Sequence, residues 1–310
     1  MNQLPNYMQK VLECIKSIKM ADAVSDWPLP CYRAEADDRV ESRHVQSLKN
    51  QLTQIVVPMA GAGSRFAKAG YEDPKPLIPV HGLRMIELVI KNLTPARYRT
   101  RFIFVVQKKQ IEEYQLDEII ETASPGCAVV AIDGLTEGAA VTVLAAAKEL
   151  DFYEPMVIAN CDQYIDASMD AFLDHWDACG AQGSIMTMTA NDPKWSFVER
   201  ANDMTVTRVV EKEVVSDEAT VGIYGFKEAG FFVDGAGRML LADDRVNKEF
   251  YVAPVYNQLI NAWRSRKPQQ KFDICTFNIG AERAGMYGLG IPDDLEYFKT
   301  LDLAKKACAD

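Results

Sequence analysis

The regular alternation of apolar and amphipathic segments after Gln54 constrains the fold of this chain more than any other feature. Short apolar runs predict strands at 55–57, 102–106, 128–132 and 156–159. Each run is followed by a segment with helical spacing of apolar residues, at 85–93, 110–122, 139–150 and 169–178. Successive strand–helix units of this kind build a mainly parallel sheet with helices on both faces. The sequence therefore predicts an α/β fold.

The second half of the chain changes character. Strands are predicted closer together, at 184–189, 197–200, 206–210 and 220–226. Their hairpin-like spacing indicates an antiparallel extension, which would make the sheet mixed. Helices are then predicted at 250–264 and 295–308, with a strand at 272–277 between them.

Residues 1–52 form a separate segment in this interpretation. Apolar residues from Met8 to Ile18 recur at helical spacing, and a second short helix is predicted at 45–52. The segment is too short and too polar to hold a core of its own. We therefore expect a helical N-terminal extension, 1–52, on a main domain, 53–310. Its apolar stripe must be covered by the main domain or by a second copy of the chain, so a homo-oligomer is one arrangement that would bury it.

Composition excludes several classes of function. The formal net charge of −10 argues against nucleic-acid binding, which depends on Lys and Arg neutralising phosphates. The seven cysteines include no C-x-x-C pair and are interpreted as reduced thiols, and the three histidines lack a zinc-binding spacing. No apolar stretch is long enough to cross a membrane, and charged residues interrupt the N-terminus. We expect a cytoplasmic protein without membrane contact.

A glycine-rich loop follows the first predicted strand, from Met59 to Arg65. Small residues let backbone N–H groups approach a ligand closely, and consecutive N–H groups form an anion-binding nest. Phe66 stands where a dinucleotide-binding loop needs its third glycine, and the Walker lysine is absent. The loop alone is also compatible with a tight structural turn.

A second segment, Asp73 to Val80, contains three prolines around Lys75. Proline restricts its own backbone and that of the preceding residue, so we expect a rigid, extended strip. A single lysine on such a strip is suited to hold a phosphate, although a solvated surface loop would have the same composition.

Together the two segments resemble the N-terminal signature of the sugar-phosphate nucleotidyltransferase superfamily. The signature here is Gly61-x-Gly63-Ser64-Arg65-Phe66, followed by Pro74-Lys75-Pro76-Leu77-Ile78-Pro79. Later segments match further family elements in the expected order: Thr136-Glu137-Gly138-Ala139-Ala140, Asn160-Cys161-Asp162, Glu211-Lys212, Val221-Gly222-Ile223-Tyr224 and Gly290-Ile291-Pro292-Asp293-Asp294-Leu295. The resemblance extends over roughly residues 54–300.

The resemblance implies a three-layer α/β/α domain with a central mixed sheet. It also implies transfer of a nucleoside monophosphate from a nucleoside triphosphate (NTP) to a sugar phosphate or a similar small phosphorylated acceptor, with release of pyrophosphate. The implied cofactor is Mg²⁺, and the implied partners are the NTP and the phosphorylated substrate.

The resemblance also assigns roles to individual positions. Arg65, Lys75 and Asp162 are the expected catalytic residues, and Asp162 is the expected metal ligand because Mg²⁺ prefers carboxylate oxygen. The expected nucleotide-binding residues are Met59, Ala60, Gly61, Ala62, Gly63, Ser64, Arg65, Glu137 and Gly138. The expected acceptor-binding residues are Lys75, Glu211, Lys212 and Gly222.

Two departures from the family pattern stand near the C-terminal end. Gly288 occupies the position where many members carry a second aspartate, and Ile291 replaces a threonine. The motif therefore assigns no second metal carboxylate. The Pro58-Met59 opening and Ser64-Arg65-Phe66 are most similar to branches that use CTP, including cytidylyltransferases of capsule and surface-glycan pathways.

Alternatives stay open at this point. A glycosyltransferase of similar architecture would consume a nucleotide sugar, but such enzymes usually carry Asp-x-Asp where this chain has Asn160-Cys161-Asp162. A non-catalytic regulatory subunit would not need to retain Arg65, Lys75 and Asp162. Asp162 could also cap the chain after a strand, and Lys212 could be a solvated strand-edge residue. Tyr251, Tyr256 and Asn257 are predicted to pack in an apolar helix.

Overall fold

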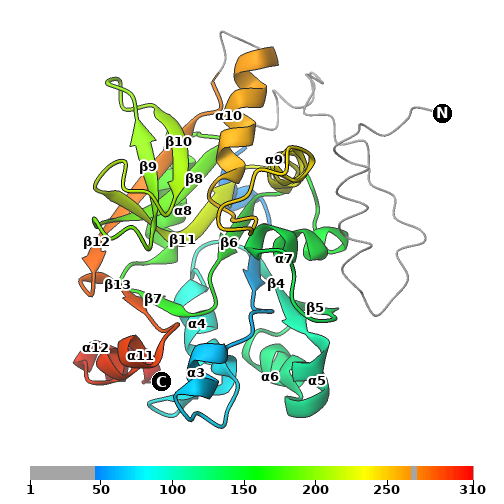
Figure 1. Cartoon of the computed structure of the whole chain (residues 1–310), viewed down its shortest axis with the longest axis vertical. Coiled ribbons are helices and arrows are strands. Elements are labelled where there is room, and N and C mark those ends of the chain that lie inside the picture. The colour runs from blue at the N-terminus through cyan, green and yellow to red at the C-terminus, as the bar shows by residue number, and fades with distance from the viewer. Residues whose placement is uncertain (1–45, 267–270, 310) are drawn as a thin grey trace, which may run out of the picture.

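The computed structural model of the chain describes residues 46–266 and 271–309. These residues build a mixed sheet of 11 strands with the main order β5-β4-β1-β6-β11-β8-β12-β13-β7 (Figure 1). Along this order only β11 and β7 run against the other strands. The bounds are β1 Thr53–Pro58, β4 Thr100–Gln107, β5 Ala128–Ile132, β6 Met156–Ala159, β7 Gln163–Ile165, β8 Gly183–Thr189, β11 Glu218–Phe226, β12 Ile274–Glu282 and β13 Gly285–Gly288. The predicted mixed α/β sheet is confirmed.

The remaining strands are short or peripheral. Strands β9 (Ser196–Arg200) and β10 (Val206–Glu211) form an antiparallel pair beside β11. Strands β2 (Pro79–Val80) and β3 (Leu83–Arg84) form a small separate ribbon. The closely spaced strands after residue 183 therefore include an antiparallel hairpin, as the sequence predicted.

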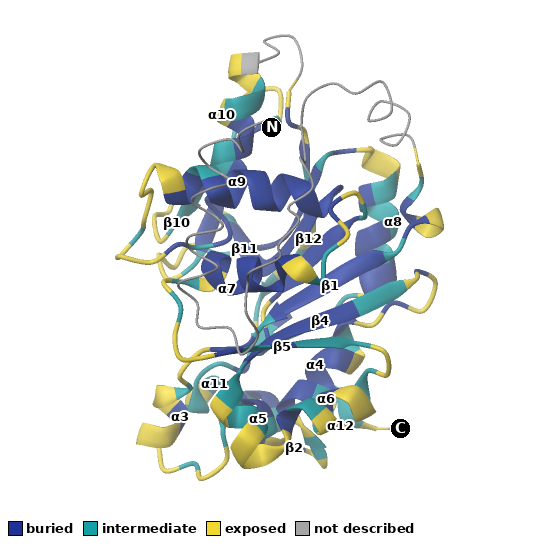
Figure 2. Cartoon of the chain, turned by 90° about the vertical axis from the view of Figure 1, so that its right-hand side faces the viewer, coloured by how far each residue is buried: buried dark blue, intermediate teal, exposed yellow. Residues whose placement is uncertain are grey.

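Helices cover both faces of the sheet, so central strands such as β1 and β6 are buried along nearly their whole length (Figure 2). Val56 of β1 belongs to the core under one set of helices, whereas Ile55 and Val57 belong to the core under the other set. The first set contains α7 (Ala139–Ala145), α9 (Ala229–Leu241) and α10 (Val255–Arg266); the second contains α4 (Met85–Leu93), α6 (Leu116–Ala123) and α8 (Met169–Cys179). The three-layer arrangement is thus present.

A third, smaller core lies beside the end of the chain. It packs Phe66, Met85, Leu295 and Phe298 together with their neighbours. The helices that meet there include α3 (Ser64–Lys68), α11 (Pro292–Lys299) and α12 (Asp302–Cys308). This core fixes the segment after the glycine loop against the C-terminal part of the chain.

The order of the parallel strands positions the candidate site. Strand β1 lies between β4 and β6 and is parallel to both, with Ile55 opposite Phe102 on one side and Val157 on the other. The loops that follow β1 and β6 therefore leave the same edge of the sheet as neighbours. Ligands of α/β sheets bind beyond this carboxyl edge.

Several predicted helices have different bounds in the structure. Gln115, with φ of 53°, divides the predicted helix 110–122 into α5 (Lys108–Tyr114) and α6. The 139–150 helix ends as α7 and continues as a 3₁₀ turn, Ala146–Lys148. The 295–308 helix is two helices, α11 and α12.

Helix α9 was missed, because its glycines lower helix propensity in an isolated sequence. At Gly235 the structure explains why a glycine stands inside the helix. A Cβ atom there would lie 2.7 Å from Val255 Cγ1 on α10. The glycine lets α9 and α10 approach closely, and this tertiary contact compensates for the weak local propensity.

At the start of the described chain, the predicted helix 45–52 was wrong. Between Gln46, where the described residues start, and β1, the chain forms a 3₁₀ turn, Leu48–Asn50, in place of the predicted helix. The amphipathic helix predicted between Met8 and Ile18 lies outside the described residues, as does most of the 1–52 extension. A search of the described chain found no helix that combines the length and the apolar character needed to span a membrane.

Candidate active site

The glycine loop leaves β1 with its first residues buried and its tip exposed. Met59 N–H donates to Val105 O at 2.9 Å, and Gln107 Nε2 donates to Ala60 O at 2.6 Å. Gly63 then takes a left-handed conformation, with φ of 59°, and begins α3. No backbone N–H from Ala60 to Arg65 donates a hydrogen bond to another described residue. These donors are available to an anionic ligand, as in an anion-binding nest.

Arg65 lies in the first turn of α3. Its side chain is exposed and has no hydrogen-bond or ion-pair partner within the part of the chain that the structure describes. The next residue, Phe66, is buried and packs edge-on against Tyr71 at a ring distance of 5.1 Å. The helix is thus anchored by Phe66 while the guanidinium of Arg65 stays free to bind.

Lys75 is held firmly between the glycine loop and Asp162. Its Cβ lies 3.6 Å from the point where a side chain on Gly63 would begin, and its Nζ donates to Asp162 Oδ2 at 3.0 Å. Burial lowers the pKa of Lys75, but the neighbouring Cys161 and Asp162 outweigh this effect and raise it above the usual lysine range. Lys75 therefore stays protonated near neutral pH.

The backbone around Lys75 differs from the sequence prediction. An extended strip was expected, whereas Lys75–Leu77 form a 3₁₀ turn. Pro76 lies at the start of this turn, where its fixed φ is compatible with helical geometry and its missing N–H costs nothing. The rigidity remains, but its origin is a turn with a buried proline.

Asp162 follows β6 at the carboxyl edge of the sheet. Its backbone oxygen accepts from Leu289 N–H at 2.8 Å, and a Cβ on Gly290 would lie 2.5 Å from its Oδ2. A side chain at position 290 would therefore displace the carboxylate. The glycine loop, Lys75, Asp162 and Gly290 form one continuous set of contacts.

Gly222 of β11 joins the same set. Its φ is 77°, and a Cβ there would lie 2.0 Å from Asn160 Nδ2. Asn160 N–H donates to Gly222 O at 3.1 Å. The glycine makes room for Asn160, which lies two residues before Asp162 in the loop after β6.

The predicted base-contacting loop lies against a different segment. Phe250 N–H donates to Glu137 O at 2.8 Å, and a Cβ on Gly138, whose φ is 131°, would lie 2.5 Å from Phe250 O. The carboxylate of Glu137 pairs with Arg245 Nη2 at 2.5 Å, and the Arg245 guanidinium stacks 4.0 Å above the Phe250 ring. Gly138 is thus required by a backbone contact within the protein.

Lys212 belongs to this second group of residues. Its φ is 58°, and its Nζ donates to Tyr251 Oη at 2.5 Å. The hydrogen bond to Tyr251 raises the pKa of Lys212 above its usual value. The neighbouring Glu211 accepts a hydrogen bond from Ser196 Oγ, and burial raises its pKa. Within residues 46–266 and 271–309, no hydrogen bond or ion pair joins Lys212 to Asp162.

Tyr251 was not predicted as a site residue. The sequence interpretation placed it inside an apolar helix, but α10 begins only at Val255. Tyr256 is in the core as predicted, and Asn257 hydrogen-bonds the backbone of Val209. No spacing pattern could have paired Tyr251 with Lys212, because the contact depends on how β10 meets the segment before α10.

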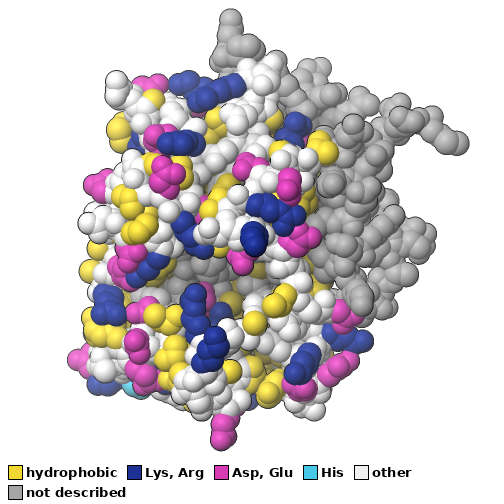
Figure 3. Space-filling model, viewed as in Figure 1, with side chains coloured by type: hydrophobic (Ala, Val, Ile, Leu, Met, Phe, Trp, Pro, Cys, Tyr) yellow, Lys and Arg dark blue, Asp and Glu magenta, His cyan; other side chains and the backbone are white. Residues whose placement is uncertain are grey.

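Basic side chains also mark this face of the molecule. Figure 3 shows Lys and Arg side chains around the middle of the view, above the position of α3 in Figure 1. The formal net charge of the whole chain is −10. Asp and Glu side chains lie between them in the same view, so the basic side chains are local groups and not a uniformly basic face.

A model of the nucleotidyl transferase family matches residues 55–249 of this chain. The chain belongs to the nucleotidyl transferase family. The matched range contains the glycine loop, Lys75, Asp162, Gly138 and Lys212. The family resemblance read from the glycine-loop signature is confirmed.

Solved structures share the fold of this nucleotidyl transferase. A nucleoside-diphosphate-sugar pyrophosphorylase from Vibrio cholerae RC9 matches 80% of this chain and 100% of its own, with 23% identity and a TM-score of 0.64. An inositol-1-phosphate CTP transferase from T. maritima matches 82% of this chain and 95% of its own, with 14% identity and a TM-score of 0.59. A search of curated protein sequences gave no match.

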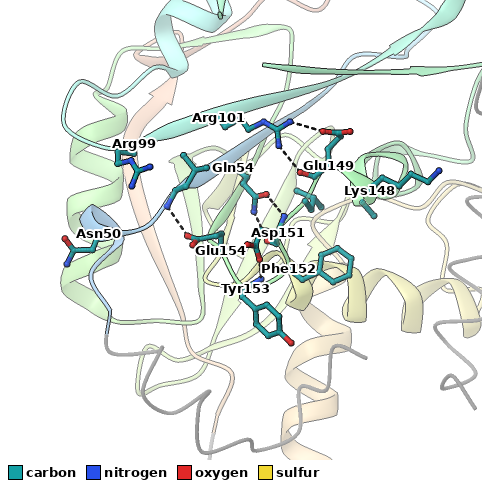
Figure 4. Close-up of a pocket in the computed structure, with 13 residues that line it drawn as sticks. Asn50, Gln54, Arg99, Arg101, Lys148, Glu149, Asp151, Phe152, Tyr153 and Glu154 are labelled. Atoms are coloured by element: carbon teal, nitrogen blue, oxygen red, sulfur yellow. Dashed lines mark hydrogen bonds and ion pairs between the residues drawn. The ribbon is translucent and has the colours of Figure 1, made fainter. Parts of the chain in front are cut away.

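One hollow of the nucleotidyl transferase lies away from these residues. It has a volume of about 1000 Å³ and is lined by residues at or just before the starts of β1, β4 and β6, including Arg101, Glu149 and Glu154 (Figure 4). It therefore opens at the amino edge of the parallel strands, opposite the glycine loop.

Proposed function

We propose that the chain transfers a nucleoside monophosphate from an NTP, with CTP slightly favoured, to a sugar phosphate or a similar small phosphorylated acceptor. One observation carries the proposal. The unpaired backbone N–H groups from Ala60 to Arg65 lie beside the Lys75–Asp162 ion pair at the carboxyl edge of the sheet. Such an edge offers donors for a triphosphate, a fixed cation and a carboxylate within one group of contacts.

The proposed reaction is a displacement at the α-phosphorus of the NTP. An oxygen of the acceptor phosphate forms a bond to the α-phosphorus, and the bond from this phosphorus to the oxygen that bridges to the β-phosphate breaks. The electron pair leaves with pyrophosphate. Phosphoryl-type transfers depend on positioning and charge neutralisation more than on covalent catalysis. The fixed ammonium of Lys75 and the free guanidinium of Arg65 supply these two functions.

Asp162 would hold the Mg²⁺ ion. Its Oδ2 is paired with Lys75, and its Oδ1 accepts no hydrogen bond within the described residues. One hard carboxylate oxygen beside a phosphate-binding loop fits Mg²⁺, which keeps several waters and commonly binds one or two carboxylates plus substrate phosphates. The bound ion would neutralise the phosphate charge that otherwise repels the anionic acceptor. We therefore expect weak Mg²⁺ binding without nucleotide.

The C-terminal end supplies no second carboxylate at position 288. A Cβ on Gly288 would lie 3.3 Å from Asp294 Oδ2, and Asp294 Oδ1 accepts from Arg283 Nη2 at 2.9 Å. The acidic group nearest to this position is thus already neutralised by an arginine. This is consistent with a metal site in which the triphosphate provides the remaining ligands.

The proposed preference for CTP has two supports. The loop variant Ser64-Arg65-Phe66 resembles CTP-using branches, and one structural relative is described as an inositol-1-phosphate CTP transferase. The proposed acceptor follows the structural relatives, which include a nucleoside-diphosphate-sugar pyrophosphorylase. A role in sugar-nucleotide synthesis for surface polysaccharides would follow from both.

A pyrophosphate-release assay tests the proposal. The full chain is incubated with Mg²⁺, each of the four NTPs in turn, and a pool of sugar phosphates. Release that needs both an NTP and the acceptor pool, fastest with CTP, is the expected result. Release of a nucleoside diphosphate from a nucleotide sugar and an alcohol acceptor, with no NTP present and no pyrophosphate formed, would indicate a glycosyltransferase. No turnover with any combination would favour a regulatory subunit.

A further inference from the structure

Three side chains with soft ligand atoms meet at the end of α8. His175 and Cys179 lie one helical turn apart on α8, and Cys275 lies on the neighbouring strand β12. Their ligand atoms, one imidazole nitrogen and two sulfurs, all lie within 4.8 Å of one another. Figure 2 shows α8 against the sheet on the side where β12 runs. None of these residues contributes to the candidate active site.

The separations agree with those of ligands on one metal ion. Zn–S bonds of about 2.3 Å and Zn–N bonds of about 2.0–2.1 Å at tetrahedral angles place a sulfur and a nitrogen about 3.6 Å apart, and two sulfurs about 3.8 Å apart. Cys179 Sγ and His175 Nε2 are 3.5 Å apart. The helical pair thus already has the separation that a tetrahedral ion requires, and Cys275 needs only a small adjustment.

The surroundings hold the ligands in place. The Cys275 thiol donates to Ser184 Oγ at 3.3 Å, and Ser184 is fully buried on β8. The His175 ring packs against Phe277 at a centroid distance of 5.5 Å. If Cys275 becomes a thiolate, the Ser184 hydroxyl can turn to donate to it, which is the kind of outer-shell contact that supports metal ligands. Cys179 is exposed, so an ion can reach the group from solvent.

We propose that His175, Cys179 and Cys275 form a zinc site that links α8 to β12. Two thiolates and an imidazole are a ligand set that selects Zn²⁺ over Mg²⁺, because Mg²⁺ prefers oxygen. Binding releases one proton from each thiol to solvent, and the neutral imidazole coordinates without losing a proton. Water completes the tetrahedron, since the described residues offer no fourth His, Cys, Asp or Glu to this group.

The position of the site indicates a structural role. Cys275 pairs with Ser184 near the start of β8, and β8 runs in the same direction as β6. The cluster therefore lies toward the amino edge of the sheet, opposite the Lys75–Asp162 pair. A zinc ion there would fix the end of α8 to β12 without touching substrate, so zinc affects stability and leaves the transfer reaction unchanged.

Cobalt and zinc titrations of the full chain test the proposal. The protein is stripped with a chelator, kept reduced, and titrated with each metal alone. We expect one equivalent bound per chain, thiolate-to-cobalt charge-transfer absorption with tetrahedral d–d bands, and a melting temperature that rises by several degrees with Zn²⁺. Cys179→Ser should lose all three effects while keeping its fold, because Cys179 is exposed.

A matched control removes a thiol elsewhere. Cys127 contacts Glu121 Oε2 at 3.3 Å, and Cys127→Ser should bind metal as the parent chain does. The zinc site is excluded if the parent chain and Cys179→Ser take up metal equally or if the cobalt complex lacks charge-transfer absorption. It is also excluded if Cys179 and Cys275 are found as a disulfide that, once reduced, still binds no metal.

Discussion

The two edges of the central sheet differ in how their polar groups are used. At the amino edge, Arg101 pairs with Glu149 at 2.8 Å, and the Gln54 side chain makes two hydrogen bonds to the backbone of Asp151 (Figure 4). At the carboxyl edge, the backbone donors from Ala60 to Arg65 have no partner among the described residues. The hollow of about 1000 Å³ thus lies where polar groups bind one another, and the unpaired donors lie at the other edge.

This difference shows which feature identifies a binding site in the fold. Polar groups that bind one another are not available to a ligand, whereas backbone donors without a partner in the chain can bind an anion. Two glycines also shape the carboxyl edge, because Gly222 and Gly290 leave room for the polar side chains of Asn160 and Asp162. If this contrast is correct, substitutions at the two edges should separate activity from stability.

The largest effect is expected for Asp162→Ala. Loss of the proposed metal carboxylate should reduce turnover by at least about 1000-fold, because a metal ion contributes several kcal/mol of charge stabilisation. The measurement is pyrophosphate release at saturating Mg²⁺, with circular dichroism as the check on folding. Excess EDTA should abolish the activity of the parent chain. Turnover that persists in EDTA would remove Asp162 from a metal role.

Lys75→Ala should lower turnover by about 100-fold or more. Its ammonium is fixed by Asp162 at 3.0 Å, and loss of a preorganised charge contact to a reacting phosphate typically costs a few kcal/mol. Steady-state kinetics measure the effect. The matched control is Arg101→Ala at the amino edge, which also breaks an ion pair. Equal losses in the two variants would show that Lys75 acts through structure.

Arg65→Lys should weaken triphosphate binding by about tenfold. A guanidinium binds phosphate through two parallel hydrogen bonds, whereas an ammonium is a point charge. Because the Arg65 side chain has no partner in the described structure, the melting temperature should stay the same. Calorimetric titration with a non-hydrolysable NTP measures the affinity. Unchanged affinity would show that Arg65 does not bind the triphosphate.

Arg101→Ala should have the smallest effect. The side chains of Arg101 and Glu149 are 35% and 41% exposed, so the pair is screened by solvent and contributes below about 1 kcal/mol. A fall in melting temperature of at most about 2–4 °C is expected, with normal turnover. Loss of turnover in a folded Arg101→Ala protein would mean that the amino edge takes part in catalysis.

Local patterns were sufficient for much of the fold. The strand 128–132 and the helix 85–93 have the predicted bounds, because their apolar spacing and the residues after them mark both ends. Helix α9 was missed because the contact of Gly235 with Val255 is tertiary and leaves no trace in a local window. Strand β13 was missed for a similar reason, since it is short and pairs with β7 from a distant part of the chain.

The residues of the candidate site also fall into those that the local sequence predicts and those that depend on tertiary contacts. The loop and Lys75 follow from composition and order along the chain, and the structure brings them together with Asp162. The roles assigned to them stay predictions. Tyr251 and Arg245 could not be predicted, because each acts through a partner far away in sequence: Lys212 for one and Glu137 for the other.

Hydrogen exchange with and without nucleotide tests the central contrast most directly. The full chain is labelled briefly in the presence of Mg²⁺ and a non-hydrolysable NTP, and peptides from both sheet edges are compared by mass spectrometry. We predict slower exchange for residues 60–65, whose N–H groups would donate to the triphosphate, and no change for residues 147–154 beside the large hollow. Protection of 147–154 with none at 60–65 would contradict the proposed site.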